Sequence, residues 1–313
     1  MTACPFCDHE RAVLVEAGQP MRGDGRWDIY CCGECGCYYP RPRLGQTESL
    51  RNLEQLNQRV QAAGERGGDP KASFPPETLV WRLKRLVTPV AWPDDARHFL
   101  RRHLNPGGLA LDLGTADGRF CFLLETVGYR AFGLEPRGTL ASRARRHGLQ
   151  VHTGYFPDAV PAEISGHAYD LISCMESIYY FVDIRRALST IYAMLKPDGH
   201  LLVKSLNAHS TYFDITGNAF ASRYGNHAQA MPTLRSLRYW MNKCGFDVVT
   251  TTGGMWPVPP AGGAIRSTMT ALGNKLRSMT IFGMPLFDLD KTEALLVLAK
   301  KRGSQEFVPA FHG

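Results

Sequence analysis

Two pairs of cysteines near the N-terminus have the spacing of a metal-binding site. Cys4 and Cys7 form one Cys-x-x-Cys pair, and Cys32 and Cys35 form a second. Four thiolates supplied by two such pairs suit a tetrahedral zinc ion in a closed, structural site. The sequence therefore predicts that these four cysteines bind Zn²⁺.

The same region leaves other ligand sets open. Cys31 and Cys37 are spare, and Cys37 or His9 could replace one of the four cysteines. Free or redox-active cysteines are the alternative interpretation. The segment 1–45 has few apolar residues, so it needs a metal to fold on its own.

Between the two cysteine pairs we expect a β-hairpin through Ala12–Val15 and Arg26–Tyr30. Pro40 and Pro42 follow the second pair and stiffen the chain. An extended linker is therefore expected to follow the hairpin and the second cysteine pair.

A second chemical pattern lies at Leu109–Gly118, where a short apolar run ends at Asp112 and Gly114 and Gly118 bracket a turn. A helix pattern follows. A buried strand, a glycine turn and a helix N-terminus together form a small-ligand cradle at the carboxyl edge of a parallel sheet. A strand, turn and helix with no ligand is the alternative.

Two common cradles are excluded. A dinucleotide fingerprint starting at Gly114 needs glycine where the chain has Ala116 and Arg119, and no Gly-Lys-Ser/Thr ends the turn as in a P-loop. Glu135 lies about twenty positions beyond the turn, at the end of the next expected strand, where a carboxylate accepts hydrogen bonds from a ribose diol. A solvated glutamate is the alternative interpretation.

These residues must be positioned by an α/β sheet. The expected strands are the run that leads into Asp112, Tyr129–Leu134, Gln150–Thr153, Tyr169–Met175, His200–Leu206, 246–252 and 293–300. Expected helices include Leu140–His147, one capped by Asp183, and Pro232–Cys244. Lys196–Gly199 is expected to be a turn before the fifth strand.

The motifs Asp-x-Gly-x-x-x-Gly at 112–118, aromatic-Pro-Arg-Pro at 39–42 and Lys-Pro-x-Gly at 196–199 resemble one family. They are similar to class I S-adenosylmethionine (SAM)-dependent methyltransferases with an N-terminal zinc ribbon, found in bacterial glycan and natural-product gene clusters. The resemblance implies a Rossmann-like, seven-stranded, mostly parallel sheet whose last strand is antiparallel, with a small ribbon and a helical lid.

The implied organisation is a zinc ribbon at 1–45, a helical linker or lid at 46–105, a methyltransferase domain at 106–302 with an insertion at 255–290, and a flexible tail at 303–313. The resemblance also implies a set of SAM-binding residues: Asp112, Gly114, Thr115, Ala116, Gly118, Glu135, Pro136, Tyr155, Phe156, Met175 and Glu176. Tyr155 stands where relatives often have an acidic residue, so adenine recognition is expected to use aromatic and backbone contacts.

Methyl transfer to an alcohol needs a general base, whereas an amine or an acidic phenol needs only positioning. The candidate bases, in decreasing order of preference, are His227, His209, Glu176 and Asp214. Ser177 stands where relatives carry histidine, which removes the usual base from that corner. For each histidine, a surface or loop-stabilising role is the alternative.

Composition narrows the function further. No apolar run approaches the ~20 residues of a membrane span, no secretion signal is evident, and a cytoplasmic enzyme is expected. The net charge is +7, but the arginines are scattered, so nucleic acid is an unlikely partner.

The function that the resemblance implies is SAM-dependent O-methylation of a sugar, a nucleotide-sugar or a natural-product scaffold. The alternatives are a zinc-ribbon RNA-base methyltransferase and a non-catalytic SAM-fold binding module. The insertion 255–290 could cover the substrate, touch a membrane surface or form a homodimer contact.

Overall fold

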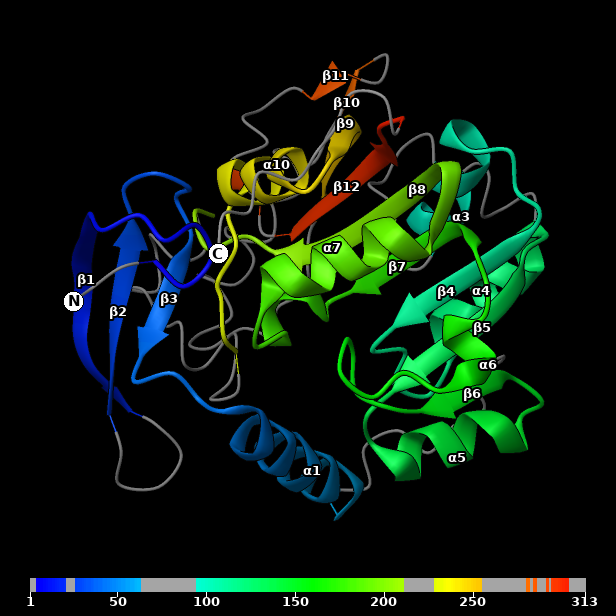
Figure 1. Cartoon of the computed structure of the whole chain (residues 1–313), viewed down its shortest axis with the longest axis horizontal. Helices are drawn as coiled ribbons and strands as arrows, with labels where there is room; N and C mark the ends of the chain where they lie inside the picture. Colours follow the sequence, from blue (N-terminus) through cyan, green and yellow to red (C-terminus); the bar gives the residue numbers. More distant parts are fainter. Residues whose placement is uncertain are drawn as a thin grey trace, which may run out of the picture.

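The computed structural model describes residues 4–20, 26–62, 94–210, 228–254 and 294–303, together with 280–281, 284–285 and 291–292. Its centre is a seven-stranded sheet in the order β6-β5-β4-β7-β8-β12-β9 (Figure 1). The strands are β4 (Leu109–Leu113), β5 (Arg130–Glu135), β6 (Gln150–Thr153), β7 (Tyr169–Met175), β8 (Leu195–Leu206), β9 (Phe246–Gly254) and β12 (Ala294–Lys301).

Neighbouring strands from β6 to β8 are parallel, and β12 is antiparallel to both β8 and β9. The Rossmann-like sheet with an antiparallel last strand is therefore confirmed. Because β4, β5, β7 and β8 run the same way, their carboxyl ends meet at one edge, which we call the carboxyl edge.

Helices cover both faces of this sheet, and each face has its own hydrophobic cluster. One face carries α3 (Asp94–His103), α4 (Arg119–Val127) and α5 (Gly138–Arg146). The other carries α6 (Ala162–Ser165), α7 (Ile184–Met194) and α10 (Leu234–Lys243). The side chains of β4 alternate between these two clusters. Ala110 belongs to the cluster on the face with α3, α4 and α5, whereas Leu111 and Leu113 belong to the cluster on the face with α6, α7 and α10.

β8 begins earlier than the sequence predicted. Lys196–Gly199 was expected to be a turn before the strand, but the strand already starts at Leu195. Tyr169 of β7 is opposite Leu195 and Leu171 is opposite His200, so the extra β8 residues form a bulge inside the ladder. Asp198 adopts a positive φ of 65° in this bulge. The tight bend is real, but it interrupts a strand and does not precede one.

The N-terminal residues form a separate three-stranded antiparallel sheet, the ribbon, of β1 (Ala12–Pro20), β2 (Arg26–Cys32) and β3 (Tyr38–Arg41). The expected hairpin is present, but the expected linker is partly wrong, because its first half is strand β3. Tyr38 also pairs through its backbone with Met231 of the larger domain, with N···O distances of 3.1 and 2.7 Å.

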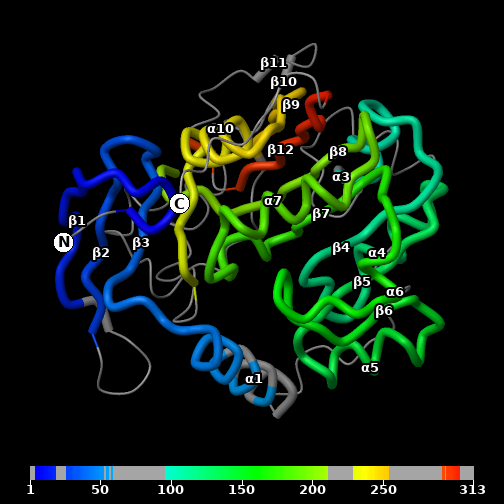
Figure 2. Tube along the Cα trace, viewed as in Figure 1, coloured from blue at the N-terminus to red at the C-terminus, as the bar shows by residue number. Residues whose placement is uncertain are grey.

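The ribbon lies against α10, as the blue trace in Figure 2 shows. Thr233, the N-cap of α10, donates its hydroxyl to the carbonyl of Gly36 at 3.1 Å. Arg235 donates to the carbonyl of Gly33 at 3.0 Å. The rings of Phe6 and Trp240 lie 5.3 Å apart. The ribbon therefore shares one hydrophobic cluster with the face of the seven-stranded sheet that carries α6, α7 and α10.

Several predicted features are only partly described. Helix α1 (Gln46–Ala62) and helix α3 lie within the predicted lid region, whereas its expected loop at 64–76 and helix at 79–87 lie outside the described residues. Only the short strands β10 (Thr280–Ile281) and β11 (Met284–Pro285) of the insertion 255–290 are described. The domain boundaries stay a prediction. Within the described residues, no helix is long and apolar enough to cross a membrane.

The glycine at the start of α4 generates a stability prediction. Gly118 has a φ of 83°, and a Cβ there would lie 2.6 Å from Leu149 Cδ1. Gly118→Ala should therefore lower the free energy of unfolding by about 2–4 kcal/mol through backbone strain and overpacking. Gly148→Ala is a matched control, because Gly148 has a φ of 81° but open space around it, and should cost only about 1–2 kcal/mol. Urea unfolding measures both, and equal losses would contradict the overpacking.

Candidate functional site

The loop after β4 is held in an unusual backbone conformation. Gly114, Ala116 and Gly118 all have positive φ, at 76°, 54° and 83°. The amides of Gly114 and Thr115 both donate to the carbonyl of Leu134 in β5, at 2.8 and 3.3 Å. The loop is thus tied to the end of the neighbouring strand, with its backbone at the carboxyl edge.

Gly114 is required by a close approach from β7. Ser177, just after β7, donates its hydroxyl to the carbonyl of Leu113 at 2.6 Å. A Cβ on residue 114 would lie 2.6 Å from Ser177 Cβ. The serine that replaces the expected histidine is therefore a joint between two strand ends, and it is buried.

Asp112 is a buried carboxylate next to this loop. Its Oδ1 accepts a hydrogen bond from the hydroxyl of Ser173 at 2.8 Å. Burial raises the pKa of Asp112 to about 7, against the lowering effect of hydrogen bonds from Thr115 and Ser173. Within the described part of the chain Asp112 forms no ion pair, so an ammonium group of a ligand would suit it.

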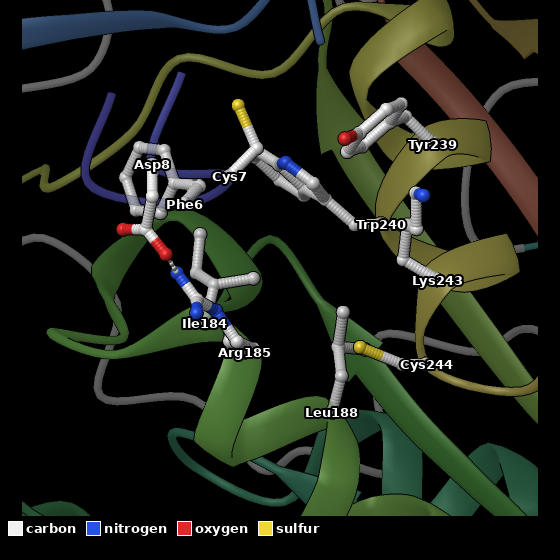
Figure 3. Close-up of a pocket in the computed structure, with 10 residues that line it drawn as sticks. All are labelled: Phe6, Cys7, Asp8, Ile184, Arg185, Leu188, Tyr239, Trp240, Lys243 and Cys244. Atoms are coloured by element: carbon white, nitrogen blue, oxygen red, sulfur yellow. Dashed lines mark hydrogen bonds and ion pairs between the residues drawn. The ribbon is translucent and has the colours of Figure 1, made fainter. Parts of the chain in front are cut away.

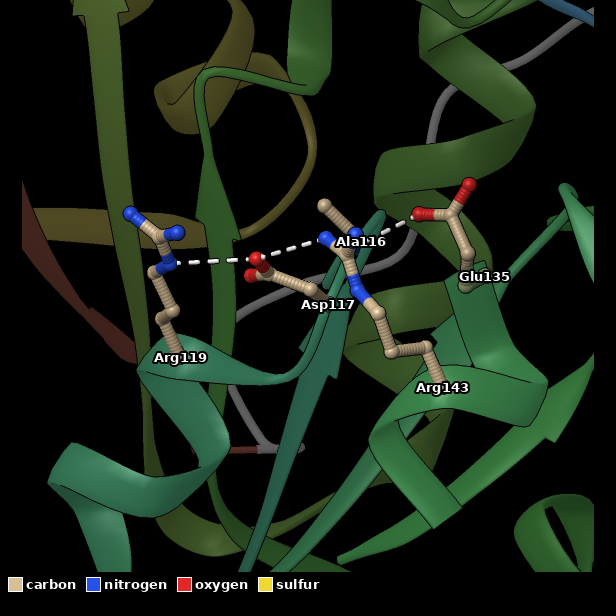
Figure 4. Close-up of polar contacts among 5 residues, drawn as sticks. All are labelled: Ala116, Asp117, Arg119, Glu135 and Arg143. Carbon is tan, nitrogen blue, oxygen red and sulfur yellow. Dashed lines mark hydrogen bonds and ion pairs between the residues drawn. The ribbon is translucent and has the colours of Figure 1, made fainter. Parts of the chain in front are cut away.

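Glu135, the last residue of β5, is equally buried (Figure 4). Its Oε2 accepts the backbone amide of Ala116 at 2.7 Å. Its Oε1 accepts the amide and the Nε of Arg137, at 3.1 and 2.6 Å. Each carboxylate oxygen has two acceptor positions, so Oε2 retains one for a ligand hydroxyl.

A group of ion pairs around Asp117, next to this loop, was not predicted from the sequence. Asp117 accepts hydrogen bonds from Arg119 Nε at 3.1 Å and Arg143 Nη2 at 3.0 Å (Figure 4). It ties the loop to the start of α4 and to α5. Arg143 lies 26 positions away, and no local pattern signals that pairing.

The remaining predicted donor-site residues lie at strand ends or next to them. Pro136 and Met175, at the ends of β5 and β7, are half-buried, and Phe156 is a core residue whose ring lies 5.7 Å from Phe181. Tyr155 is half-buried and its hydroxyl is buried with no hydrogen-bond partner. Of Tyr155 and Phe156, Tyr155 is therefore the residue whose polar group, the hydroxyl, is available to a ligand.

The predicted base Glu176 lies at the end of β7 with a φ of 60°. Such a backbone conformation in a non-glycine residue is strained and concentrates at functional sites. Tyr179, in the short helix η2 (Ile178–Tyr180), donates its hydroxyl to Glu176 Oε2 at 3.0 Å. Lys204 Nζ lies 3.1 Å from Glu176 Oε1, an ion pair without hydrogen-bond alignment.

Lys204 and Tyr179 were not predicted as site residues. A lysine inside the apolar strand 200–206 is the signal that could have marked the first, because a buried lysine needs a partner. Tyr179 carries no comparable signal, because an aromatic residue after a strand is usually core.

Two of the other candidate bases, His227 and Asp214, lie outside the described residues. His209 follows β8, and its backbone amide donates to the side-chain oxygen of Asn207 at 3.0 Å. Glu176 has a defined polar cluster with Tyr179 and Lys204 at the carboxyl edge.

The four predicted metal ligands come together. The sulfur atoms of Cys4, Cys7, Cys32 and Cys35 all lie within 4.8 Å of one another. The Cys4–Cys35 and Cys7–Cys32 pairs are 3.8 and 3.5 Å apart. Four sulfurs at 2.3 Å from a tetrahedral zinc ion are about 3.8 Å apart, so the cluster is compatible with zinc binding.

The cluster borders a cavity of about 290 Å³ between the first cysteine pair, α7 and α10 (Figure 3). Phe6 and Trp240 form part of its wall, and Asp8 accepts a hydrogen bond from Arg185 at 2.6 Å at its rim. The cavity lies in the seam between the ribbon and the two helices.

Comparison with known proteins places this geometry in a family. A family model described as the methyltransferase domain matches residues 89–251, which is more than half of the 313 residues. The ubiquinone biosynthesis O-methyltransferase of Bradyrhizobium diazoefficiens is 31% identical over 104 residues. That match covers 32% of this chain and 41% of the relative, so it spans about two fifths of the relative's length.

Solved structures agree on the fold. A SAM-dependent methyltransferase of Thermotoga maritima, described as a possible histamine N-methyltransferase, matches with a TM-score of 0.52 and 16% identity, over 81% of this chain and all of that one. The magnesium protoporphyrin IX methyltransferase of Synechocystis, with bound SAH, matches with a TM-score of 0.51 and 13% identity, over 82% and 100%. The chain therefore belongs to the methyltransferase domain family and has the class I SAM-dependent methyltransferase fold that its motifs predicted.

Proposed function

We propose that this chain transfers the methyl group of SAM to an oxygen atom of a small molecule, such as a sugar, a nucleotide-sugar or a natural-product scaffold. The observation that carries the proposal is the pair of buried carboxylates, Asp112 and Glu135, on either side of the glycine loop. A curated relative named as an O-methyltransferase supports oxygen as the acceptor atom.

The residues at the carboxyl edge suit the parts of SAM. Bound SAM supplies a methyl carbon made electrophilic by a positively charged sulfur. Asp112 would hold the ammonium group, because it is a buried carboxylate without an ion pair in the described residues. Glu135 Oε2 would accept a ribose hydroxyl, and the Tyr155 hydroxyl would meet the adenine side. The other predicted donor contacts, from Gly114 to Glu176, stay part of this proposal.

Glu176 is the general base that the described contacts favour. The hydrogen bond from Tyr179 would fix the orientation of its carboxylate, and Lys204 would supply the counter-charge of the ionised carboxylate before it takes up a proton. The group would accept the proton of an acceptor hydroxyl as the oxygen attacks. His227, His209 and Asp214 remain the other candidates.

We further propose that Cys4, Cys7, Cys32 and Cys35 hold a structural Zn²⁺ ion. The hydrogen bond between Cys4 and Cys35 lowers the pKa of Cys4 to about 6 and raises the pKa of Cys35, so Cys4 is the thiolate of this pair. The ion would fix the turns that carry Phe6 and Gly36 to α10. The ribbon then has a structural role at the seam.

The cellular compartment and the oligomeric state of the protein are also proposals. All nine cysteines are free, which suits a reducing, cytoplasmic compartment. A homodimer contact through 255–290 stays a prediction, because most of that insertion lies outside the described residues. Nothing in the described part of the chain favours RNA over a small molecule.

Incubation with methyl-labelled SAM and a panel of sugars, nucleotide-sugars, phenols and RNA tests the proposed function directly. Label that appears only in RNA would overturn the proposal.

The raised pKa of Asp112 predicts a pH-dependent affinity for SAM. A carboxyl group whose folded-state pKa is raised to about 7 is mostly protonated at pH 6 and charged at pH 8. Affinity for the ammonium group should therefore rise about tenfold from pH 6 to pH 8. Calorimetry measures the effect, and Asp112→Asn should weaken binding and flatten the pH profile. An unaltered profile in the variant would remove Asp112 as the ammonium contact.

The zinc proposal predicts a difference between two adjacent cysteines. Cys32→Ser should abolish stoichiometric zinc, measured by mass spectrometry of the metal. It should also unfold the ribbon, since zinc supplies about 10–16 kcal/mol in comparable small sites. Cys31→Ser should retain zinc, because Cys31 lies outside the four-sulfur cluster. Near-ultraviolet circular dichroism follows the ribbon, and full metal content in Cys32→Ser would refute this ligand set.

Replacing the proposed base predicts a selective loss of turnover. Glu176→Gln should lower kcat by about 10²–10⁴-fold with the acceptor identified in the labelling screen, a far larger effect than its effect on the Kd for SAM. The exposed Glu163 of α6 gives the control Glu163→Gln, which should behave as wild type. A variant at 176 with normal kcat would transfer the role to one of the histidines or show that positioning suffices.

A further inference from the structure

The segment 228–231 runs between the ribbon and the helix η2. On one side, Met231 pairs with Tyr38 of β3. On the other side, the amides of Gln229 and Ala230 donate to the carbonyl of Tyr179, at 2.8 and 3.3 Å. Tyr179 is the residue whose hydroxyl binds Glu176. Gln229 therefore contacts Tyr179, which in turn contacts the proposed base Glu176.

The side chain of Gln229 is fully buried and has no polar partner among the described residues. Its exposed fraction is 0%, and within that part of the chain both Oε1 and Nε2 lack a hydrogen bond. A buried polar group without a partner destabilises the folded protein, because it has lost its hydrogen bonds to water. A leucine of similar size would avoid that cost, so the position is not explained by stability.

A second neutral group at the same edge has the same property. Ser210 follows β8 and is 1% exposed, and its buried hydroxyl has no partner in the part of the chain that the structure describes. Beside them, Glu176 has Lys204 as a counter-charge at 3.1 Å, although its Oε1 is likewise buried without an aligned hydrogen bond. Gln229 and Ser210 are uncharged, and hydroxyl groups of a ligand would satisfy such groups without burying a further charge.

We propose that the side-chain amide of Gln229 binds the methyl acceptor and selects one with adjacent, uncharged hydroxyl groups, as on a sugar ring. A carboxamide offers both an acceptor oxygen and a donor NH₂ group. Two neighbouring hydroxyls match it, because one donates to Oε1 while the other accepts from Nε2. This inference rests on the proposed function, and it narrows the acceptor from any oxygen nucleophile to a polyhydroxylated one.

The competing explanation is a structural water held by the amide, since buried water commonly satisfies such groups. The two explanations differ in their response to a ligand. A water-bound amide is indifferent to added sugar, whereas an acceptor-binding amide changes its environment when the sugar binds.

The experiment follows the Gln229 side-chain NH₂ resonance by NMR in ¹⁵N-labelled full-length protein saturated with SAH. Methyl α-D-glucopyranoside, which carries adjacent hydroxyls, is the probe. Tetrahydropyran-2-methanol, which has a similar ring but a single hydroxyl, is the matched control. A saturable shift with the first and none with the second is expected. No shift with the glucoside would overturn the inference.

Variants give an independent measurement. Gln229→Leu should weaken binding of the glucoside by about tenfold or more, because two hydrogen bonds are lost, while the Kd for SAH stays unchanged. Gln150→Leu, at an exposed amide at the start of β6, should bind as wild type. Equal glucoside binding by wild type and Gln229→Leu would assign the amide to a structural water. Should Gln229→Leu fail to fold, the wild-type resonance still decides the question.

The outcomes separate this inference from the one it rests on. Failure of the wild-type protein to bind SAH would overturn the proposed function itself. Binding of SAH without any response of the Gln229 amide to the glucoside would overturn only the acceptor assignment.

Discussion

The close approach of Ser177 to Gly114 is the contact on which the arrangement of the site depends. It joins the carboxyl ends of β4 and β7, with the Ser177 hydroxyl 2.6 Å from the carbonyl of Leu113. On one side of this joint lie Asp112 and the glycine loop, which form the proposed donor site. On the other lies Glu176, at the start of the proposed acceptor site. A side chain at 114 would push the two halves apart, because its Cβ would overlap Ser177.

The ribbon extends this arrangement from the outside. Its strand β3 pairs with Met231, and the same short segment is bonded to the carbonyl of Tyr179 through Gln229 and Ala230. A cysteine cluster that fixes the ribbon therefore also supports the residue that orients Glu176. In the proposed arrangement, the ribbon is thus connected to the acceptor side through the backbone of residues 229–231. This connection also explains why a segment with so little core of its own shares the hydrophobic cluster of the larger domain.

Much of the fold follows from local sequence signals. The strand limits at Gln150–Thr153 and Tyr169–Met175 were predicted as observed, because short apolar runs bounded by turn residues report burial directly. The cap at Asp183 was also confirmed, since its side chain accepts the amide of Arg186. The four cysteines were identified by spacing alone. In each case the signal lies within a few residues, or in a residue type with few other uses.

What the sequence could not predict depends on contacts between distant residues. The start of β8 was misplaced because pairing with β7 overrides a turn sequence, and β3 became a strand because β2 and Met231 supply its partners. The partners of Glu176 belong to the same class, since Lys204 comes from a different strand. Acceptor sites are assembled from such distant pieces, whereas the donor loop is nearly contiguous. This is the physical reason why the proposed methyl donor was easier to infer than the acceptor.

Charge explains how a basic chain can suit a cationic donor. The net charge is +7, which by itself would repel a sulfonium and an ammonium group. Near the glycine loop, however, Arg137 is paired with Glu135, and Arg119 and Arg143 are paired with Asp117. These pairs set two carboxylates against three arginines and so offset most of the local positive charge, and charges farther away than about 8 Å are screened at physiological salt. Asp112 is then the buried carboxylate at this edge without an ion pair in the described residues. The preference for a cationic ligand therefore depends on one local group and not on the charge of the whole protein.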